Sequence, residues 1–133
     1  MFETAANRYT QIRNSTSSPG ELLLALYDGL FRFMNGARVC IEKKEMGRAR
    51  ELLSKAYAIV SELYIALDHE AAPELCERLE SVYGFAMDRL TGASRKGDIT
   101  MVDDAIRVLT PLREAWRIAV PEAQRESASK GSK

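Results

Sequence analysis

The chain contains one histidine, His69, which is the first residue to test for catalytic or metal chemistry. It stands between Asp68 and Glu70, and consecutive residues on a helix point roughly 100° apart. The three side chains therefore cannot converge on one metal ion from a single helix face. A phosphate-accepting histidine would lie mid-helix on an exposed face, whereas His69 lies near a predicted helix end just before Pro73. Its position favours a solvated or helix-capping side chain.

The two cysteines, Cys40 and Cys76, form no CxxC pair and have no nearby histidine, which argues against a zinc site. We interpret them as reduced thiols packed as small hydrophobic side chains. The sequence also lacks a glycine-rich phosphate loop, a nucleophile elbow and an isolated acid pair in apolar surroundings. It therefore predicts no catalytic residue, no cofactor and no metal site, and a binding protein rather than an enzyme.

The composition limits the possible partners. The chain has 133 residues, of which 46% are hydrophobic and 29% charged, as expected for one globular domain. Lys plus Arg equals Asp plus Glu at 19 each, so no positive surplus indicates a nucleic-acid partner. Charged residues interrupt every apolar stretch before the roughly 20 residues of a membrane span. The N-terminus lacks the pattern of a signal peptide, so we expect a cytoplasmic protein with no membrane partner.

Apolar residues recur at spacings of three and four along most of the chain, which predicts helices, and no alternating strand pattern is present. A short amphipathic helix is expected over 2–13. The run Ser18-Pro19-Gly20-Glu21 predicts the start of a second helix, with Ser18 as its cap, which extends toward Lys44. A third helix should begin near Met46 and end before Pro73, since the residue preceding a proline avoids helical geometry.

Two further helices are expected in the second half of the chain. Pro73 is suited to the first turn of a fourth helix, and Gly97 is suited to its C-terminal end. Asp98 should cap a fifth helix, within which Pro111 should remove one hydrogen bond and bend the axis. After Pro121 the sequence offers little to bury, which predicts a disordered tail.

Together these elements predict an all-α fold, an antiparallel four-helix bundle with a short additional N-terminal helix. We divide the chain into a mobile amphipathic cover over 1–13, the helical bundle over 14–120 and a disordered C-terminal tail over 121–133. A helix of about 12 residues is marginal alone in water, so the first segment must dock to persist.

The width of the apolar faces is the most informative functional feature. A helix packed on one side of a small bundle needs a stripe of somewhat over 100°, but three of the predicted helices carry an extra row beside it. Either these helices are central and have more neighbours, or the bundle has a groove for the apolar faces of a partner's helices. Tyrosines suit such a groove because the ring packs while the hydroxyl stays hydrated. The additional row comprises Leu22, Tyr27, Phe31, Leu53, Tyr57, Tyr64, Cys76, Tyr83 and Met87.

The order of several residues resembles the flagellar secretion chaperones of the FliS family. The most specific element is Leu26-Tyr27-Asp28-Gly29 after a Ser-Pro helix cap. Ala71-Ala72-Pro73 departs from the glycine-rich turn of many members, and Glu45 replaces a capping Asp. The resemblance extends to Trp116 through Tyr9, Ile12, Ser18-Pro19, Glu21-Leu22, Ser61-Glu62-Leu63, Leu67-Asp68, Glu70, Glu74-Leu75, Leu79, Tyr83, Arg89-Leu90 and Leu112-Arg113-Glu114-Ala115-Trp116.

The resemblance implies a chaperone that binds the C-terminal segment of newly made flagellin, prevents its polymerisation and assists its delivery to the flagellar type III export apparatus. It also implies that Tyr9 and Ile12 belong to a segment that covers part of the binding surface. An alternative is a regulatory adaptor that binds another flagellar regulator, such as an anti-sigma factor. Free, the chain should be a monomer or a weak homodimer. The candidate partner-binding residues are Tyr9, Ile12, Leu22, Tyr27, Asp28, Phe31, Tyr57, Tyr64, Tyr83 and Met87.

Overall fold

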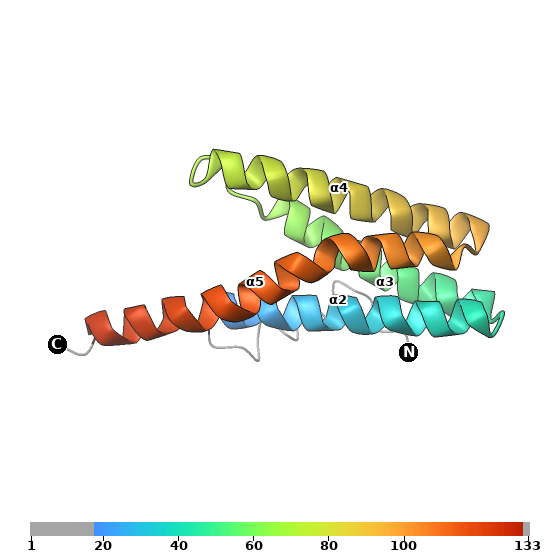
Figure 1. Cartoon of the computed structure of the whole chain (residues 1–133), viewed down its shortest axis with the longest axis horizontal. Coiled ribbons are helices and arrows are strands. Elements are labelled where there is room, and N and C mark those ends of the chain that lie inside the picture. The colour runs from blue at the N-terminus through green and yellow to red at the C-terminus, as the bar shows by residue number, and fades with distance from the viewer. Residues whose placement is uncertain (1–17, 132–133) are drawn as a thin grey trace.

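The computed structural model describes residues 18–131, which form four helices: α2 (Pro19–Glu42), α3 (Met46–Ile65), α4 (Pro73–Lys96) and α5 (Ile99–Gly131). α2 and α4 each pack against both α3 and α5, so the helices form a ring. Successive helices run in opposite directions (Figure 1). The predicted all-α four-helix bundle is confirmed. The predicted N-terminal helix and the cover over 1–13 lie outside the described residues.

The helix ends follow the local signals in the sequence. The Ser18 hydroxyl accepts a hydrogen bond from the Glu21 backbone N–H at 3.1 Å, as a helix cap should. Gly97 ends α4 with φ of 65°, a left-handed conformation that glycine adopts without strain. The Asp98 carboxylate accepts hydrogen bonds from the Thr100 hydroxyl at 2.7 Å and from the Thr100 backbone N–H at 2.9 Å, which lower the pKa of Asp98. These three termini are therefore determined by short-range hydrogen bonding.

Two boundaries differ from the expectation. α2 ends at Glu42, and Lys44 adopts a left-handed φ of 61° in the tight turn to α3. The larger difference is at the C-terminus, where α5 continues through Pro121 to Gly131 although the sequence predicts disorder from 121 on. The segment after Pro121 contains strong helix formers, which propagate the preceding helix even though their side chains are exposed.

The interior of the bundle is apolar and receives side chains from all four helices. No polar or charged residue is among the buried ones in the described part of the chain. Both cysteines are free thiols, and the Cys76 thiol is buried and donates to the Asp68 carbonyl at 3.2 Å. No described helix is both long and apolar enough to cross a membrane. The largest fully buried side chains are Tyr27, Leu30, Met34, Leu53, Val60, Leu90, Val102 and Leu109.

Candidate functional site

α4 and α5 pack closely near the turn that joins them. A Cβ atom on Gly92 would overlap the side chain of Met101, and the Arg89 guanidinium lies 4.0 Å from the Asp104 carboxylate. These two pairs define the antiparallel register of the helices. Continued along both helices at the same spacing, the register would bring Phe85 opposite Val108, Val82 opposite Pro111, and Leu75 opposite Ile118.

α5 does not follow α4 through the whole of this register. It bends away from α4 near its middle and continues beside α2 (Figure 1). Pro111 lies within this helix and cannot donate a hydrogen bond to the carbonyl of Arg107, one turn earlier. The expected bend therefore has its chemical cause in this proline.

Contacts with α2 hold the second half of α5 in its new direction. The Asp28 carboxylate pairs with Arg113 at 2.8 Å and with Arg117 at 3.4 Å. Further along, a Cβ on Gly20 would come within 2.6 Å of Val120, so the absence of a side chain at Gly20 allows this close approach. α5 is thus tied to α2 over about two turns, and α4 loses its neighbour.

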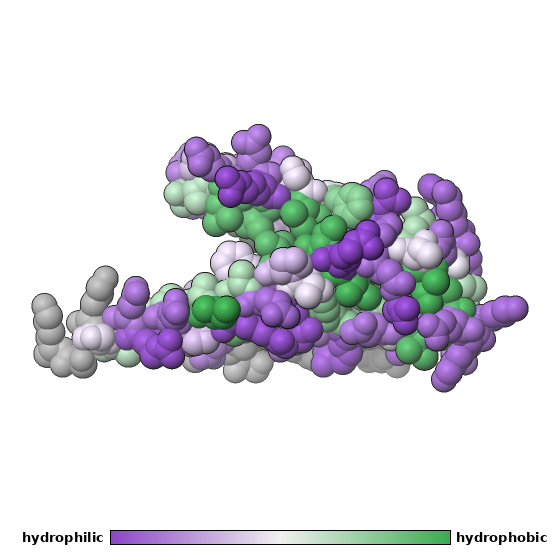
Figure 2. Space-filling model, viewed as in Figure 1, coloured by the Kyte–Doolittle hydropathy of each residue, from purple (hydrophilic) through white to green (hydrophobic). Residues whose placement is uncertain are grey.

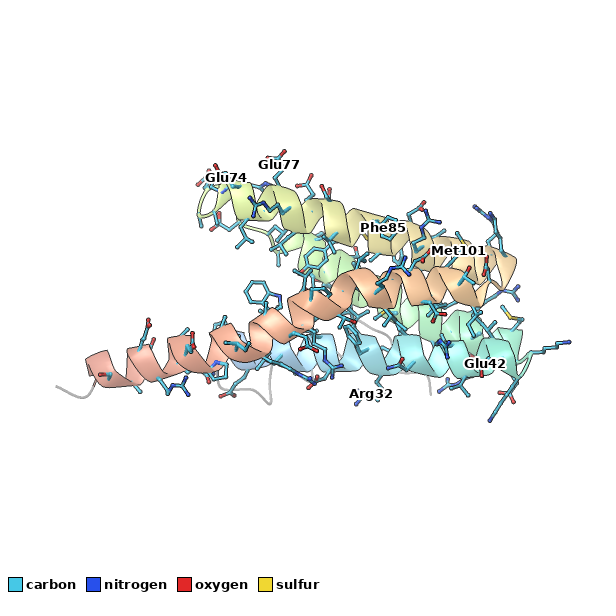
Figure 3. The ribbon with its side chains drawn as sticks, viewed as in Figure 1. Arg32, Glu42, Glu74, Glu77, Phe85 and Met101 are labelled. Atoms are coloured by element: carbon cyan, nitrogen blue, oxygen red, sulfur yellow. The ribbon has the colours of Figure 1, made fainter. Side chains whose placement is uncertain are left out.

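The divergence opens a notch between the N-terminal half of α4 and the C-terminal half of α5. Figure 2 shows it as a hollow whose α4 wall is hydrophobic and whose α5 wall is mixed. On α4, Leu75 is 47% exposed and Phe85 is 37% exposed, although both lie on the flank that meets α5 elsewhere. Glu74 and Glu77 project from the outer side of α4, away from α5 (Figure 3). By helical spacing, the facing flanks of the two helices carry Leu75, Val82 and Phe85 on α4 and Leu112, Ala115 and Ala119 on α5, and we define the notch by these residues.

Arg89 contributes to the closed end of the notch. Its guanidinium lies 4.9 Å from the centre of the Phe85 ring, a cation–π geometry that covers one part of the ring. The remaining exposed part of Phe85, together with Leu75, offers apolar area to a partner. On the opposite wall, Ala115 and Ala119 are small and exposed, which leaves room for side chains from outside.

The core behind the notch contains an aromatic cluster of Tyr27, Tyr83 and Trp116, whose polar atoms are buried. The hydroxyls of Tyr27 and Tyr83 are hydrogen-bonded at 2.6 Å and link α2 to α4 across the ring. Burial raises the pKa of both tyrosines above 10, which keeps them neutral. The buried indole N–H of Trp116 lies near both hydroxyls and moderates these shifts, but it forms no aligned hydrogen bond. This cluster joins the helices that surround the notch.

A second concave surface lies between α3 and α4 at the other end of the bundle. It is a shallow pocket of about 440 Å³, at whose edge Tyr57 is 41% exposed. No cluster of metal-ligating side chains is found among the described residues. His69 is exposed and lies 3.1 Å from Glu80 on α4. The pocket is lined by Arg50, Leu53, Ser54 and Tyr57 of α3 and by Leu90, Thr91, Ser94 and Arg95 of α4.

Comparison with known proteins identifies the family. The model of a family described as "Flagellar protein FliS" matches residues 2–123. The chain belongs to the FliS family. A "Flagellar secretion chaperone FliS" of Bacillus subtilis (strain 168) is 32% identical over 123 residues, covering 92% of this chain and 91% of the relative. Proteins of the same name from Campylobacter jejuni and Salmonella typhimurium are 30% and 29% identical, covering 85% and 81% of this chain and 88% and 81% of the relatives.

The family element Leu26-Tyr27-Asp28-Gly29 has a structural role in this chain. Leu26 and Tyr27 are buried in the core, where Tyr27 bonds to Tyr83. Asp28 is the anchor for the two arginines of α5. The element therefore fixes α4 and the bent part of α5 relative to α2, and so supports the walls of the notch.

The ten residues predicted to bind a partner fall into different environments. Tyr27, Phe31 and Tyr83 are buried, so their side chains are not offered to a partner in this arrangement of the helices. Leu22 and Met87 are half-buried against the core. Tyr57 and Tyr64 are exposed on α3, and Asp28 is exposed but paired. Tyr9 and Ile12 lie outside the described residues. Partner contact by any of these ten stays a prediction.

Most residues of the notch could not be predicted as a binding surface from the sequence. Leu75, Val82, Phe85, Ala115 and Ala119 are not among the ten candidate partner-binding residues. Periodicity predicts which residues share a helix face, but not whether the neighbouring helix stays alongside. Pro111 was the available signal, because a bend in the last helix must remove neighbours from the helix before it.

Proposed function

We propose that this chain is an export chaperone that holds the C-terminal segment of flagellin in the cytosol, with the notch as its main binding surface. The held segment cannot polymerise and is delivered to the flagellar type III export apparatus. Membership of the FliS family establishes the export-chaperone role. The exposed apolar flanks of α4 and α5 are the observation that supports the assignment of this role to the notch.

The chemistry of the notch suits an amphipathic segment. Leu75 and Phe85 present apolar surface on one wall, and the two alanines of α5 leave space for large side chains on the other. Beside the N-terminal half of α4, a partner helix could occupy the place that the diverging α5 leaves free. Its leucines or phenylalanines would then complete the packing of α4. Occupancy alone then blocks polymerisation, because the apolar face of the segment is no longer available to other flagellin molecules.

The energetics require several anchors. Each fully buried Leu, Phe or Met side chain contributes about 1.5–3 kcal/mol, and ordering a disordered ligand costs about 2–5 kcal/mol or more. One anchor is therefore insufficient for stable binding, whereas three or four give a favourable balance. A notch that extends over several turns of two helices can accept such a number.

The proposal is tested by measuring binding of a flagellin C-terminal peptide to the full chain by calorimetry. Leu75→Glu and Ala119→Glu each place a charge on one wall of the notch at an exposed position, so the fold should persist. We expect each to weaken binding at least about tenfold, since a buried unpaired charge costs more than about 1.4 kcal/mol.

Val39→Glu is the matched control, because Val39 on α2 is as exposed as Leu75 but lies far from the notch. It should bind the peptide like the unsubstituted chain. Equal losses in all three variants, or no saturable binding by the unsubstituted chain, would refute the proposal. Circular dichroism of each variant confirms that the helices are retained.

A further inference from the structure

The pocket between α3 and α4 is built from both helices in a repeating pattern. Arg50, Ser54 and Tyr57 follow each other at spacings of four and three on α3, and Thr91 and Ser94 continue the other side on α4. The floor is formed by Leu53 and Leu90, which are buried. Small hydroxyl side chains on the walls above an apolar floor leave space for the side chains of a docked helix.

All charged side chains that line this pocket are positive. Two arginines, Arg50 and Arg95, stand at its edge, and no carboxylate is among its lining residues. Arg50 donates from Nε to the Ser94 carbonyl at 3.0 Å, which holds the guanidinium over the pocket and leaves its terminal nitrogens available. Arg95 makes no ion pair among the salt bridges of the described residues. An apolar floor beside two positive groups is complementary to an apolar side chain next to a carboxylate.

We propose that this pocket docks an amphipathic helix of a second protein, one that carries a carboxylate beside its apolar stripe. A leucine-sized side chain of that helix contacts Leu53, Leu90 and Tyr57. Its carboxylate pairs with Arg50 and Arg95. The hydroxyls of Ser54, Thr91 and Ser94 contact the polar margin of the docked helix.

The pocket and the notch share no residues. The pocket lies on the seam between α3 and α4, near the C-terminal end of α4, whereas the notch lies between α4 and α5 and reaches the N-terminal end of α4. The chain can therefore hold its client and the second protein at the same time. Docking at the pocket does not depend on the identity of the client in the notch.

The test uses two synthetic helical peptides of about four turns with the same leucine stripe at spacings of three and four. One has two glutamates beside the stripe, and the other has lysines at these positions. Binding to the full chain is followed by NMR. We expect saturable amide shifts at Ser54, Thr91 and Ser94 with the glutamate peptide. Arg95→Glu should weaken its binding about fivefold and strengthen binding of the lysine peptide.

Arg125→Glu is the matched control, since Arg125 is exposed on the distal part of α5 and far from the pocket. It should leave both peptides unaffected. Ser54→Trp should fill the pocket and abolish the shifts. Equal binding of the two peptides, shifts confined to the notch, or displacement of the glutamate peptide by a flagellin C-terminal peptide would overturn the proposal. Simultaneous binding of both peptides would support it.

Discussion

The hydrogen bond between Tyr27 and Tyr83 allows a quantitative test of how the bundle holds its shape. Tyr27→Phe removes one hydroxyl and leaves the other buried without its partner. An unsatisfied buried hydroxyl costs about 1–3 kcal/mol of the free energy of unfolding. The same loss is expected for Tyr83→Phe. The 2.6 Å bond joins two helices that lie across the ring from each other, so its loss should lower the stability of the whole bundle.

The double variant distinguishes this explanation from loss of packing. With both hydroxyls removed, no unsatisfied oxygen remains, so the double variant should lose less than the sum of the single losses by about 1 kcal/mol or more. Urea denaturation of the three variants, followed by circular dichroism, measures these values. Losses that add within about 0.5 kcal/mol would refute the reasoning.

The same variants separate structural support from client contact. Because Tyr27 is buried, Tyr27→Phe should leave the affinity for a flagellin C-terminal peptide unchanged at temperatures where the protein is folded. A large loss of affinity in a folded Tyr27→Phe protein would show that the partner reaches this side chain, contrary to our account.

Three further predictions concern pH, the helix interior and the α5 anchor. Burial raises the pKa of Tyr27 and Tyr83 above 10, so stability is full below about pH 10 and falls above it. The fall is up to about 1.4 kcal/mol per pH unit for each tyrosine, and alkaline denaturation should be shallower in the double Phe variant. Gly84→Ala should stabilise the chain by about 0.5–1 kcal/mol, since the new Cβ at this position would meet nothing within 4 Å. Thermal unfolding measures this change, and a decrease in stability would contradict the prediction. Asp28→Asn should cost about 0.5–1 kcal/mol and speed amide hydrogen exchange around Arg113, whereas unchanged exchange would show that the ion pairs do not hold α5.

The helices and most of their ends could be predicted because their causes are local. Ser18, Gly97 and Asp98 act through hydrogen bonds or backbone angles within a few residues of their own positions. The bend at Pro111 was also predictable from the missing N–H. The helical extension beyond Pro121 was not, because the low hydrophobicity of this segment indicates disorder while its helix propensity indicates a helix.

The binding surface could be predicted only in outline. Tyr27 and Tyr83 belong to the same kind of additional apolar row as Tyr57 and Tyr64, yet the first two are buried and the second two are exposed. The position of a tyrosine in this row determines the direction of its side chain around the helix axis. Whether that side chain is buried depends on where the neighbouring helices pass. The direction of α5 after Pro111 depends on its contacts with α2, among them the pairing of Arg113 with Asp28, which are far apart in the sequence.

Site-specific photocrosslinking tests the central claim most directly, since it reports where the client lies on the folded chaperone. A photoreactive side chain is placed at Ala119 on the notch wall or at Val39 on α2, and each protein is irradiated with a flagellin C-terminal peptide. Our account predicts a crosslinked product from position 119 and none from position 39. Equal yields from both positions, or a product from position 39 alone, would contradict it.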